Sequence, residues 1–257
     1  LSNLSPVQQV VSFHIGFNML LVVMGLPFVK PITRVLLKIM SDGRINNDQP
    51  LSSRQSGLKE ADIKLPTRAL AATTRELLYL AESVQTMFVP AMDIYENFDK
   101  VGVKELKKIE NEIFDVHGRI KNYLAKVSQQ NLSEDLLKRN GDLMMFADNM
   151  AAATDVIVNR LLKLAKERNE KALVFSDEGW RELLALHDRV LVNMQLAMDV
   201  LVSSDLETAR QLIIEKNELS SMTQKSLSKH LERLSRHKTK SLETSNMHNE
   251  TLRALRQ

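Results

Sequence analysis

A repeat at a constant spacing of 106 residues is the feature of this 257-residue sequence that most restricts its fold. Three separated strings recur at that spacing: Arg75-Glu76-Leu77-Leu78 as Arg181-Glu182-Leu183-Leu184, Ala91-Met92-Asp93 as Ala197-Met198-Asp199, and Asn111-Glu112 as Asn217-Glu218. Chance seldom keeps one offset over three matches, so the sequence predicts two copies of one structural unit.

The predicted unit is helical. All six prolines lie at or before Pro90, and long stretches after it contain no helix-breaking residue. Apolar residues recur every three or four positions, as on a helix packed in a bundle, at Leu106, Ile109, Ile113, Val116, Ile120, Tyr123 and Val127 in the first copy and at Trp180, Leu183, Val190, Met194, Ala197 and Leu201 in the second. Breaks near 101–102, 129–133, 171–177, 203–205 and 235–241 divide the chain into six helices. We therefore expect an all-α fold with two three-helix bundles side by side, at residues 65–172 and 173–257.

The N-terminal part is apolar. Residues 10–29 contain no Asp, Glu, Lys or Arg, and twenty helical residues span roughly 30 Å, the thickness of a bilayer's hydrocarbon core. The alternative is a buried globular helix, but the length and the missing charges favour one transmembrane helix. Basic residues occur only after Val29, so the positive-inside rule predicts a cytoplasmic location for the rest, at the cell inner membrane. Residues 1–40 are predicted to be the last part of a membrane domain, and residues 41–64 are predicted to form a linker. Pro66, just after the linker, is well placed to begin a helix.

Composition excludes several classes of protein. The chain has no cysteine, so disulfides, thiolate metal sites and a cysteine nucleophile are excluded. A net charge of +3 argues against nucleic acid as a partner. No nucleophile elbow, phosphate-binding glycine loop or zinc-binding His-Glu-x-x-His string is present, so we do not expect an enzyme.

Several strings resemble one family. Phe13-His14, Phe17-Asn18 and Leu26-Pro27 are similar to the end of the transport domain in bacterial sodium/phosphate symporters. The string from Phe175 to Leu183, with His187 after it, resembles the start of the second unit in the PhoU-type domain of that family. The strings from His230 to Leu234 and from Ser241 to Ser245, with His248, resemble its closing segment. The resemblance implies a transmembrane helix followed by a PhoU-like tandem of two three-helix bundles.

The resemblance also implies a function. The chain would be the cytoplasmic regulatory domain of a sodium-dependent phosphate transporter, and it would bias phosphate transport without catalysing a reaction. The alternative is a scaffold or oligomerisation bundle with no sensing role. Because the chain starts at Leu1, we expect it to be the tail of a longer protein whose transport domain lies upstream. Partners would be that domain, phosphate and sodium through it, the membrane, and a second copy of the chain.

Acidic residues provide a candidate metal site. Glu112 and Asp115 are three residues apart, so they share a helix face, and Asp155 could join them across the bundle to hold a divalent cation. The alternative is a solvated acidic edge paired with Arg119. PhoU-type domains usually have a Glu where Ala151 stands, and Asp148 could replace it. Glu218 repeats Glu112, but Ser221 stands where the second acid would be, which makes a second site weaker.

Three polar residues lie in apolar surroundings. His14 and Asn18 are four apart and share one face of the predicted membrane helix, where polar groups line a pathway or form hydrogen bonds between helices. His187 falls on the apolar stripe of the second copy. We expect it to be a core histidine.

Overall fold

The computed structural model describes residues 14–19, 55–235 and 244–257, and for residues 233–235 it describes only the backbone. The chain divides into two compact units, Leu1–Gln49 and Pro50–Gln257. In the first unit, residues 14–19 are helical with exposed side chains, and the rest of the predicted membrane segment at 10–29 lies outside the described residues. None of the helices in the described ranges has the length and apolar character that crossing a membrane requires.

The second unit is built from helices, and its described part contains no strand. The predicted all-α class is confirmed. In chain order the elements are η3 (Glu60–Lys64), α2 (Pro66–Phe88), α3 (Ala91–Glu96), α4 (Lys100–Ser128), α5 (Glu134–Asp155), the π-helix η4 (Val156–Leu161), α6 (Leu162–Glu170), α7 (Asp177–Ser203), α8 (Leu206–Ser235) and α10 (Ser245–Arg256).

Most helix boundaries follow the predicted breaks. Pro66 is the first residue of α2, where its missing N–H costs nothing. The side chains of Ser133 and Ser176 accept hydrogen bonds from the first turns of α5 and α7, as N-caps do. The break predicted near 101–102 instead lies at 97–99, because Asp99 caps α4 by accepting from the N–H groups of both of those residues.

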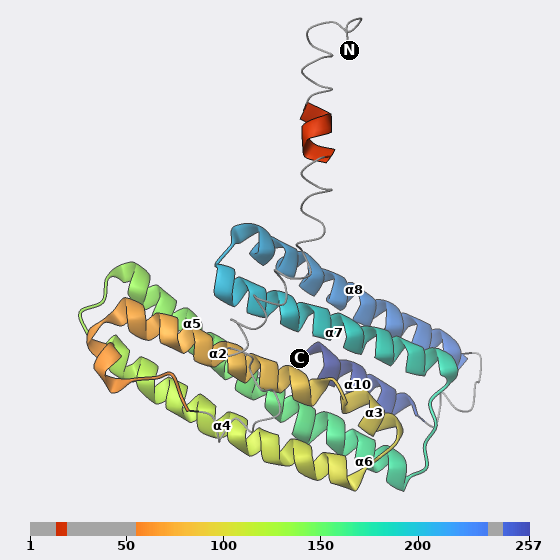
Figure 1. Ribbon diagram of the computed structural model, residues 1–257. Coiled ribbons are helices and arrows are strands. Elements are labelled where there is room, and N and C mark those ends of the chain that lie inside the picture. Colours follow the sequence, from red (N-terminus) through yellow and green to blue (C-terminus); the bar gives the residue numbers. More distant parts are fainter. Residues whose placement is uncertain (1–13, 20–54, 236–243) are drawn as a thin grey trace, which may run out of the picture. The chain divides into compact units, whose positions relative to one another are not determined.

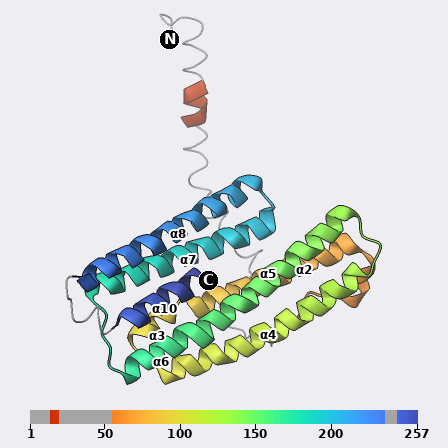
Figure 2. The same cartoon turned by 180° about the vertical axis from the view of Figure 1, so that it is seen from behind.

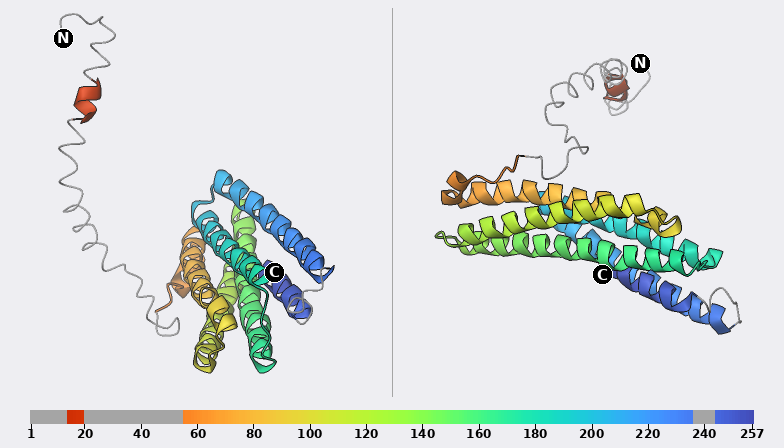
Figure 3. Two further views of the ribbon diagram at one scale, coloured as in Figure 1. Left: turned by 90° about the vertical axis from the view of Figure 1, so that its right-hand side faces the viewer. Right: turned by 90° about the horizontal axis from the view of Figure 1, so that it is seen from below.

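Helix packing joins the two halves of this unit. Helices α2, α4 and α5 pack against one another, α7 packs against both α2 and α8, and α10 packs against α7, α8 and η4 (Figures 1 and 2). Figure 3 shows the long helices from two further directions. Helices α4 and α8 begin 106 residues apart, at Lys100 and Leu206, which is the spacing of the repeated strings.

The core follows the predicted apolar stripes. On α4, Ile113, Val116, Ile120 and Val127 are at most 1% exposed. On α7, Leu183 and Leu201 are buried. His187 is also buried, with its Nε2 atom 2.9 Å from the carbonyl oxygen of Phe88 and its ring 4.4 Å from the ring of Phe88. The prediction of a core histidine is confirmed. The contacts between His187 and Phe88 join α7 to the C-terminal end of α2.

Candidate functional site

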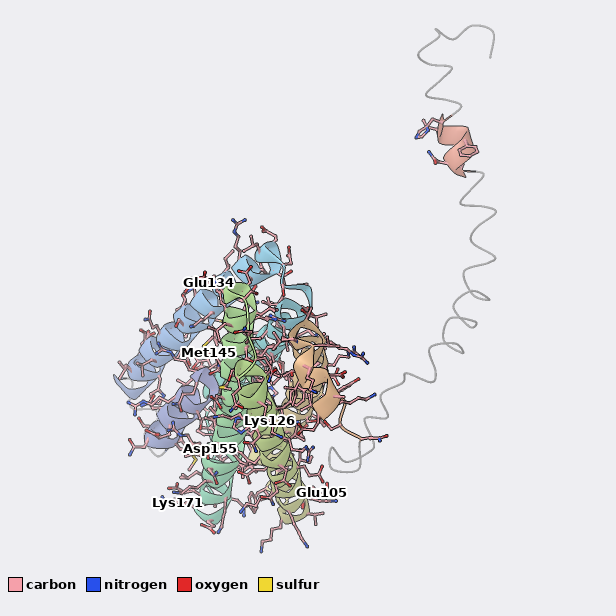
Figure 4. All side chains as sticks on the ribbon, turned by 90° about the vertical axis from the view of Figure 1, so that its left-hand side faces the viewer. Glu105, Lys126, Glu134, Met145, Asp155 and Lys171 are labelled. Atoms are coloured by element: carbon pink, nitrogen blue, oxygen red, sulfur yellow. The ribbon has the colours of Figure 1, made fainter. Side chains whose placement is uncertain are left out.

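Helices α4 and α5 run antiparallel, as the predicted metal site requires. The Nε2 atom of His117 and the Nζ atom of Lys121 lie 2.8 Å and 3.0 Å from the same carboxylate oxygen of Asp148. Figure 4 shows the same direction of packing, since Glu105 of α4 and Lys171, just after α6, lie at the same end of the bundle. The bonds from Lys121 and His117 hold the pKa of Asp148 below its usual range. Asp148 is thus engaged by two side chains of α4.

Asp155 lies level with Glu110 of α4. The side-chain nitrogen of Asn159 bridges the two carboxylates, 2.8 Å from an oxygen of Asp155 and 3.4 Å from an oxygen of Glu110. Burial and the nearby charge of Asp155 raise the pKa of Glu110. Asn159 belongs to η4, and single π-turns inside α-helices frequently occur at functional sites. The structure therefore brings together a carboxylate pair in which Glu110 is a residue that sequence reasoning missed.

Replacing Glu110 by Gln is expected to stabilise the fold slightly at pH 7. A raised pKa in the folded state means that the ionised carboxylate costs stability above that pKa, and Gln keeps the acceptor for Asn159 without the charge. We expect a rise of about 1–2 °C in melting temperature at pH 7, which disappears below about pH 4, where the carboxyl is protonated in both states. Thermal unfolding monitored by circular dichroism at both pH values measures it. Glu112→Gln on the same helix is the control, and an equal rise in both variants would contradict the explanation.

The other predicted metal ligands differ in exposure and in their contacts. Glu112 is half-buried and Asp115 is exposed. Glu218 pairs instead with Arg189 of α7. Within the described ranges, no three His, Asp or Glu side chains are grouped closely enough to hold a metal ion. The divalent-metal site remains a prediction from the sequence.

A buried polar group lies between α7, α8 and α10. We call it the histidine cluster, and it consists of Glu182, Ser226, His230, Ser245 and His248. The hydroxyl of Ser226 donates to a Glu182 oxygen at 2.7 Å, and the Nε2 atom of His248 lies 3.7 Å from that oxygen. The His230 and His248 rings stack with centres 4.8 Å apart, and His230 Nε2 is 2.9 Å from the Ser245 hydroxyl.

The histidine cluster brings three helices together through buried side chains. Its two imidazoles are at most 2% exposed, and the Glu182 carboxylate lies near the His248 ring. Gly179 of α7 lies close to the cluster, since a Cβ at that position would lie 3.1 Å from the Ser176 hydroxyl oxygen and 3.4 Å from a ring nitrogen of His248. The cluster therefore fixes three helices at one place and is sensitive to any change in their spacing.

An aromatic group next to the cluster joins the two halves of the chain. We call it the aromatic junction, formed by Tyr95, Arg168, Phe175 and Trp180. The three rings stack with each pair of centres 6.1 Å apart, and the Arg168 guanidinium lies 5.9 Å from the Phe175 ring and 6.0 Å from the Trp180 ring. Phe175 also contacts His248 edge-on, so the junction and the cluster form one continuous packed region.

Helix α10 is tied to the junction by a buried hydrogen bond. The Tyr95 and Thr251 hydroxyls are 2.7 Å apart, and Thr251 donates its own hydrogen to the Met247 carbonyl at 2.7 Å. Tyr95 is therefore the donor to Thr251. Burial raises the pKa of Tyr95 to about 12. This bond links the first copy of the repeat to the last helix of the second.

Sequence reasoning placed these residues in family-like strings without identifying a site. Trp180, Glu182, His230, Ser245 and His248 all fall in or beside the strings that resemble the PhoU-type domain. The residues come from three helices, so no single helical period could show that they meet. His14 and Asn18, the polar pair of the predicted membrane helix, are helical and exposed within the first unit. Their role beside a transport pathway remains a prediction from the sequence.

The chain is similar to proteins named for phosphate export. It is 28% identical over 249 residues to the "Putative inorganic phosphate export protein YjbB" of Escherichia coli (strain K12) and of Shigella flexneri, covering 96% of this chain and 45% of each relative. The protein of that name from Salmonella typhimurium is 28% identical over 241 residues, covering 94% of this chain and 44% of the relative. No family model matches the chain, and no solved structure matches it significantly. The chain thus spans less than half the length of these relatives.

Proposed function

We propose that the second unit, residues 50–257, is the regulatory domain of a phosphate-transporting membrane protein. In this proposal it is a PhoU-like tandem of helical bundles on the cytoplasmic side of the membrane. It biases phosphate movement through a transport domain that precedes it. The observation that carries the proposal is the similarity to proteins named for phosphate export, which extends over 96% of the chain and so includes nearly all of this helical unit.

The packing of the unit supports a regulatory role. The histidine cluster and the aromatic junction meet at Phe175, where α10 contacts α7 and the first copy of the repeat contacts the second. A change in the position of one helix there must alter buried polar contacts of the others. Two packings of such a region can differ by only a few kcal/mol, which is the energy range over which a signal can bias a domain.

A second candidate function is a scaffold that holds copies of the protein together without sensing anything. The observation that favours it is the row of exposed apolar side chains on α8, which includes Leu206 and Ile213. A scaffold would leave the rate of phosphate movement per molecule and its response to phosphate supply unchanged. The two functions therefore differ in a measurable way.

The experiment compares cells that produce the longer protein with and without residues 55–257. Cells loaded with radiolabelled phosphate are followed for release of the label, in phosphate-rich medium and after phosphate starvation. We expect removal of the unit to change the release rate and to weaken its dependence on phosphate supply. The amount of each protein in the membrane fraction is measured alongside. Equal release and an unchanged starvation response at equal protein amounts would remove the regulatory function and leave the scaffold.

A further inference from the structure

The outer face of α8 exposes a row of large apolar side chains. Five of them, which together we call the apolar face, have the following exposed fractions: Leu206 73%, Ile213 60%, Ile214 56%, Leu227 43% and Leu231 57%. Val202, near the end of α7, is a further large apolar residue, 59% exposed. A single exposed apolar residue is ordinary, but a row along one helix face marks a surface that another molecule covers.

The internal repeat provides a direct comparison for this face. Because α4 and α8 begin 106 residues apart, each position of α8 has a counterpart on α4. Leu206, Ile213, Ile214 and Leu227 correspond to Lys100, Lys107, Lys108 and Lys121. Four of the five residues of the apolar face thus correspond to lysines on α4, and the fifth, Leu231, corresponds to Ala125. The fold does not need apolar residues at these positions, so their place on α8 serves something outside the unit.

The spacing on α8 identifies the kind of partner. Leu206, Ile213, Ser220 and Leu227 are each seven residues apart, which places them on one face in the spacing of a helix that packs along another helix. Ile213 and Leu227 lie equally far on either side of Ser220. A second α8 running antiparallel would therefore place Ile213 against Leu227 of the partner subunit, and Leu227 against Ile213 of the partner subunit. This is the self-complementary pairing that a two-fold dimer requires.

We propose that the apolar face of α8 is the interface of a homodimer in which the two α8 helices pack antiparallel, with the two-fold axis close to Ser220. Ser220 is small and half-buried, so it lets the helix axes approach at the centre of the contact. Ile213 and Leu227 of the two chains form apolar contacts on both sides of it. This interface does not depend on the proposed regulatory function, because it follows from the surface of α8 alone.

Disulfide cross-linking tests the proposal at a defined position. The chain has no cysteine, so Ser220→Cys introduces a single thiol. The 257-residue chain is purified in detergent, oxidised, and run on a denaturing gel. A disulfide requires Cα atoms within about 7 Å. The proposed two-fold axis brings the two residues 220 together, so we expect most of the Ser220→Cys protein to form a covalent dimer. Gln224→Cys is the matched control on the same helix, and there antiparallel packing separates the two thiols by about 12 Å along the axis, so no dimer band should form.

A second set of variants separates this face from any other contact between chains. In the Ser220→Cys background, Ile213→Lys with Leu227→Lys places on α8 the residues that α4 carries, and we expect the dimer band to be lost. Leu137→Lys, at a 54% exposed position on α5, should leave the band intact. Circular dichroism checks that all variants stay helical. Absence of a band in Ser220→Cys, equal bands in Ser220→Cys and Gln224→Cys, or a band that survives both lysine substitutions would overturn the proposal.

Discussion

Between pH 9 and pH 12, the wild-type helical unit is expected to lose about 2 kcal/mol more of its free energy of unfolding than the Tyr95→Phe variant. Burial raises the pKa of Tyr95 from 10.0 to about 12 in the folded state. The folded protein therefore keeps the phenol proton over a range in which the unfolded chain releases it. Stability supplied by this difference is complete below pH 10 and is lost as the pH rises towards 12, at about 1.36 kcal/mol per unit.

Urea unfolding at pH 9 and at pH 12 measures this effect as a difference between the two proteins. The Phe variant lacks the hydroxyl that donates to Thr251 and should be less stable than wild type by about 1 kcal/mol at pH 9. Its disadvantage should then vanish or reverse at pH 12. Because lysines and other tyrosines titrate equally in both proteins, their contribution cancels. Parallel pH curves for the two proteins would mean that Tyr95 is accessible to water, and that the aromatic junction is open in solution.

Replacing Arg168 by Met is expected to lower the free energy of unfolding by about 2–4 kcal/mol. The Nη1 atom of Arg168 donates to the carbonyls of Tyr95 and Glu96, at 2.9 Å and 2.7 Å. It therefore provides hydrogen-bond donors for the last carbonyl groups of α3. Hydrogen bonds from a charged donor contribute about 1.5–3 kcal/mol, and the guanidinium over the Phe175 and Trp180 rings adds about 0.5–1 kcal/mol. Met keeps the length of the stem, so the loss reports mainly on the guanidinium.

Urea unfolding measures this loss. It is followed by the fluorescence of Trp180, which is the only tryptophan in the sequence and belongs to the aromatic junction. Arg253→Met is the matched control, because the Arg253 side chain is 75% exposed and forms an ion pair with Glu250 one turn away. The control should change the free energy of unfolding by no more than about 0.5 kcal/mol. Equal losses in both variants would show that Arg168 does not hold α3 against α6 and α7.

The repeat and the helical periodicity predicted most of the fold because they depend on local sequence. Helix ends at Pro66, Ser133 and Ser176 agree with the predicted positions, since capping is decided by a few neighbouring residues. The π-turn at Val156–Leu161 left no such signal. The carboxylate pair could not be predicted either. Whether Asp155 meets Glu110 or Glu112 depends on how far α5 slides along α4, and that register is set by tertiary packing.

The histidine cluster shows a different limit of sequence reasoning. Glu182, Ser226 and His248 are 44 and 22 residues apart, and they meet only because α7, α8 and α10 pack together. Their strings could be recognised as family-like, but the contact between them is a product of the fold. The apolar face of α8 lies between these cases. Its exchange of lysine for leucine between the copies is visible in the sequence, whereas the exposure of those side chains requires the structure.

The rate of phosphate movement per transporter molecule, measured in reconstituted vesicles with residues 55–257 present and removed, tests the central claim most directly. Purified protein in vesicles removes the cell's own response to phosphate and allows the rate to be divided by the amount of protein. If the helical unit biases transport, the two initial rates should differ by about fivefold or more, which corresponds to the lower end of usual coupling free energies. Equal rates per molecule, over a range of phosphate concentrations on both sides of the membrane, would contradict the regulatory function.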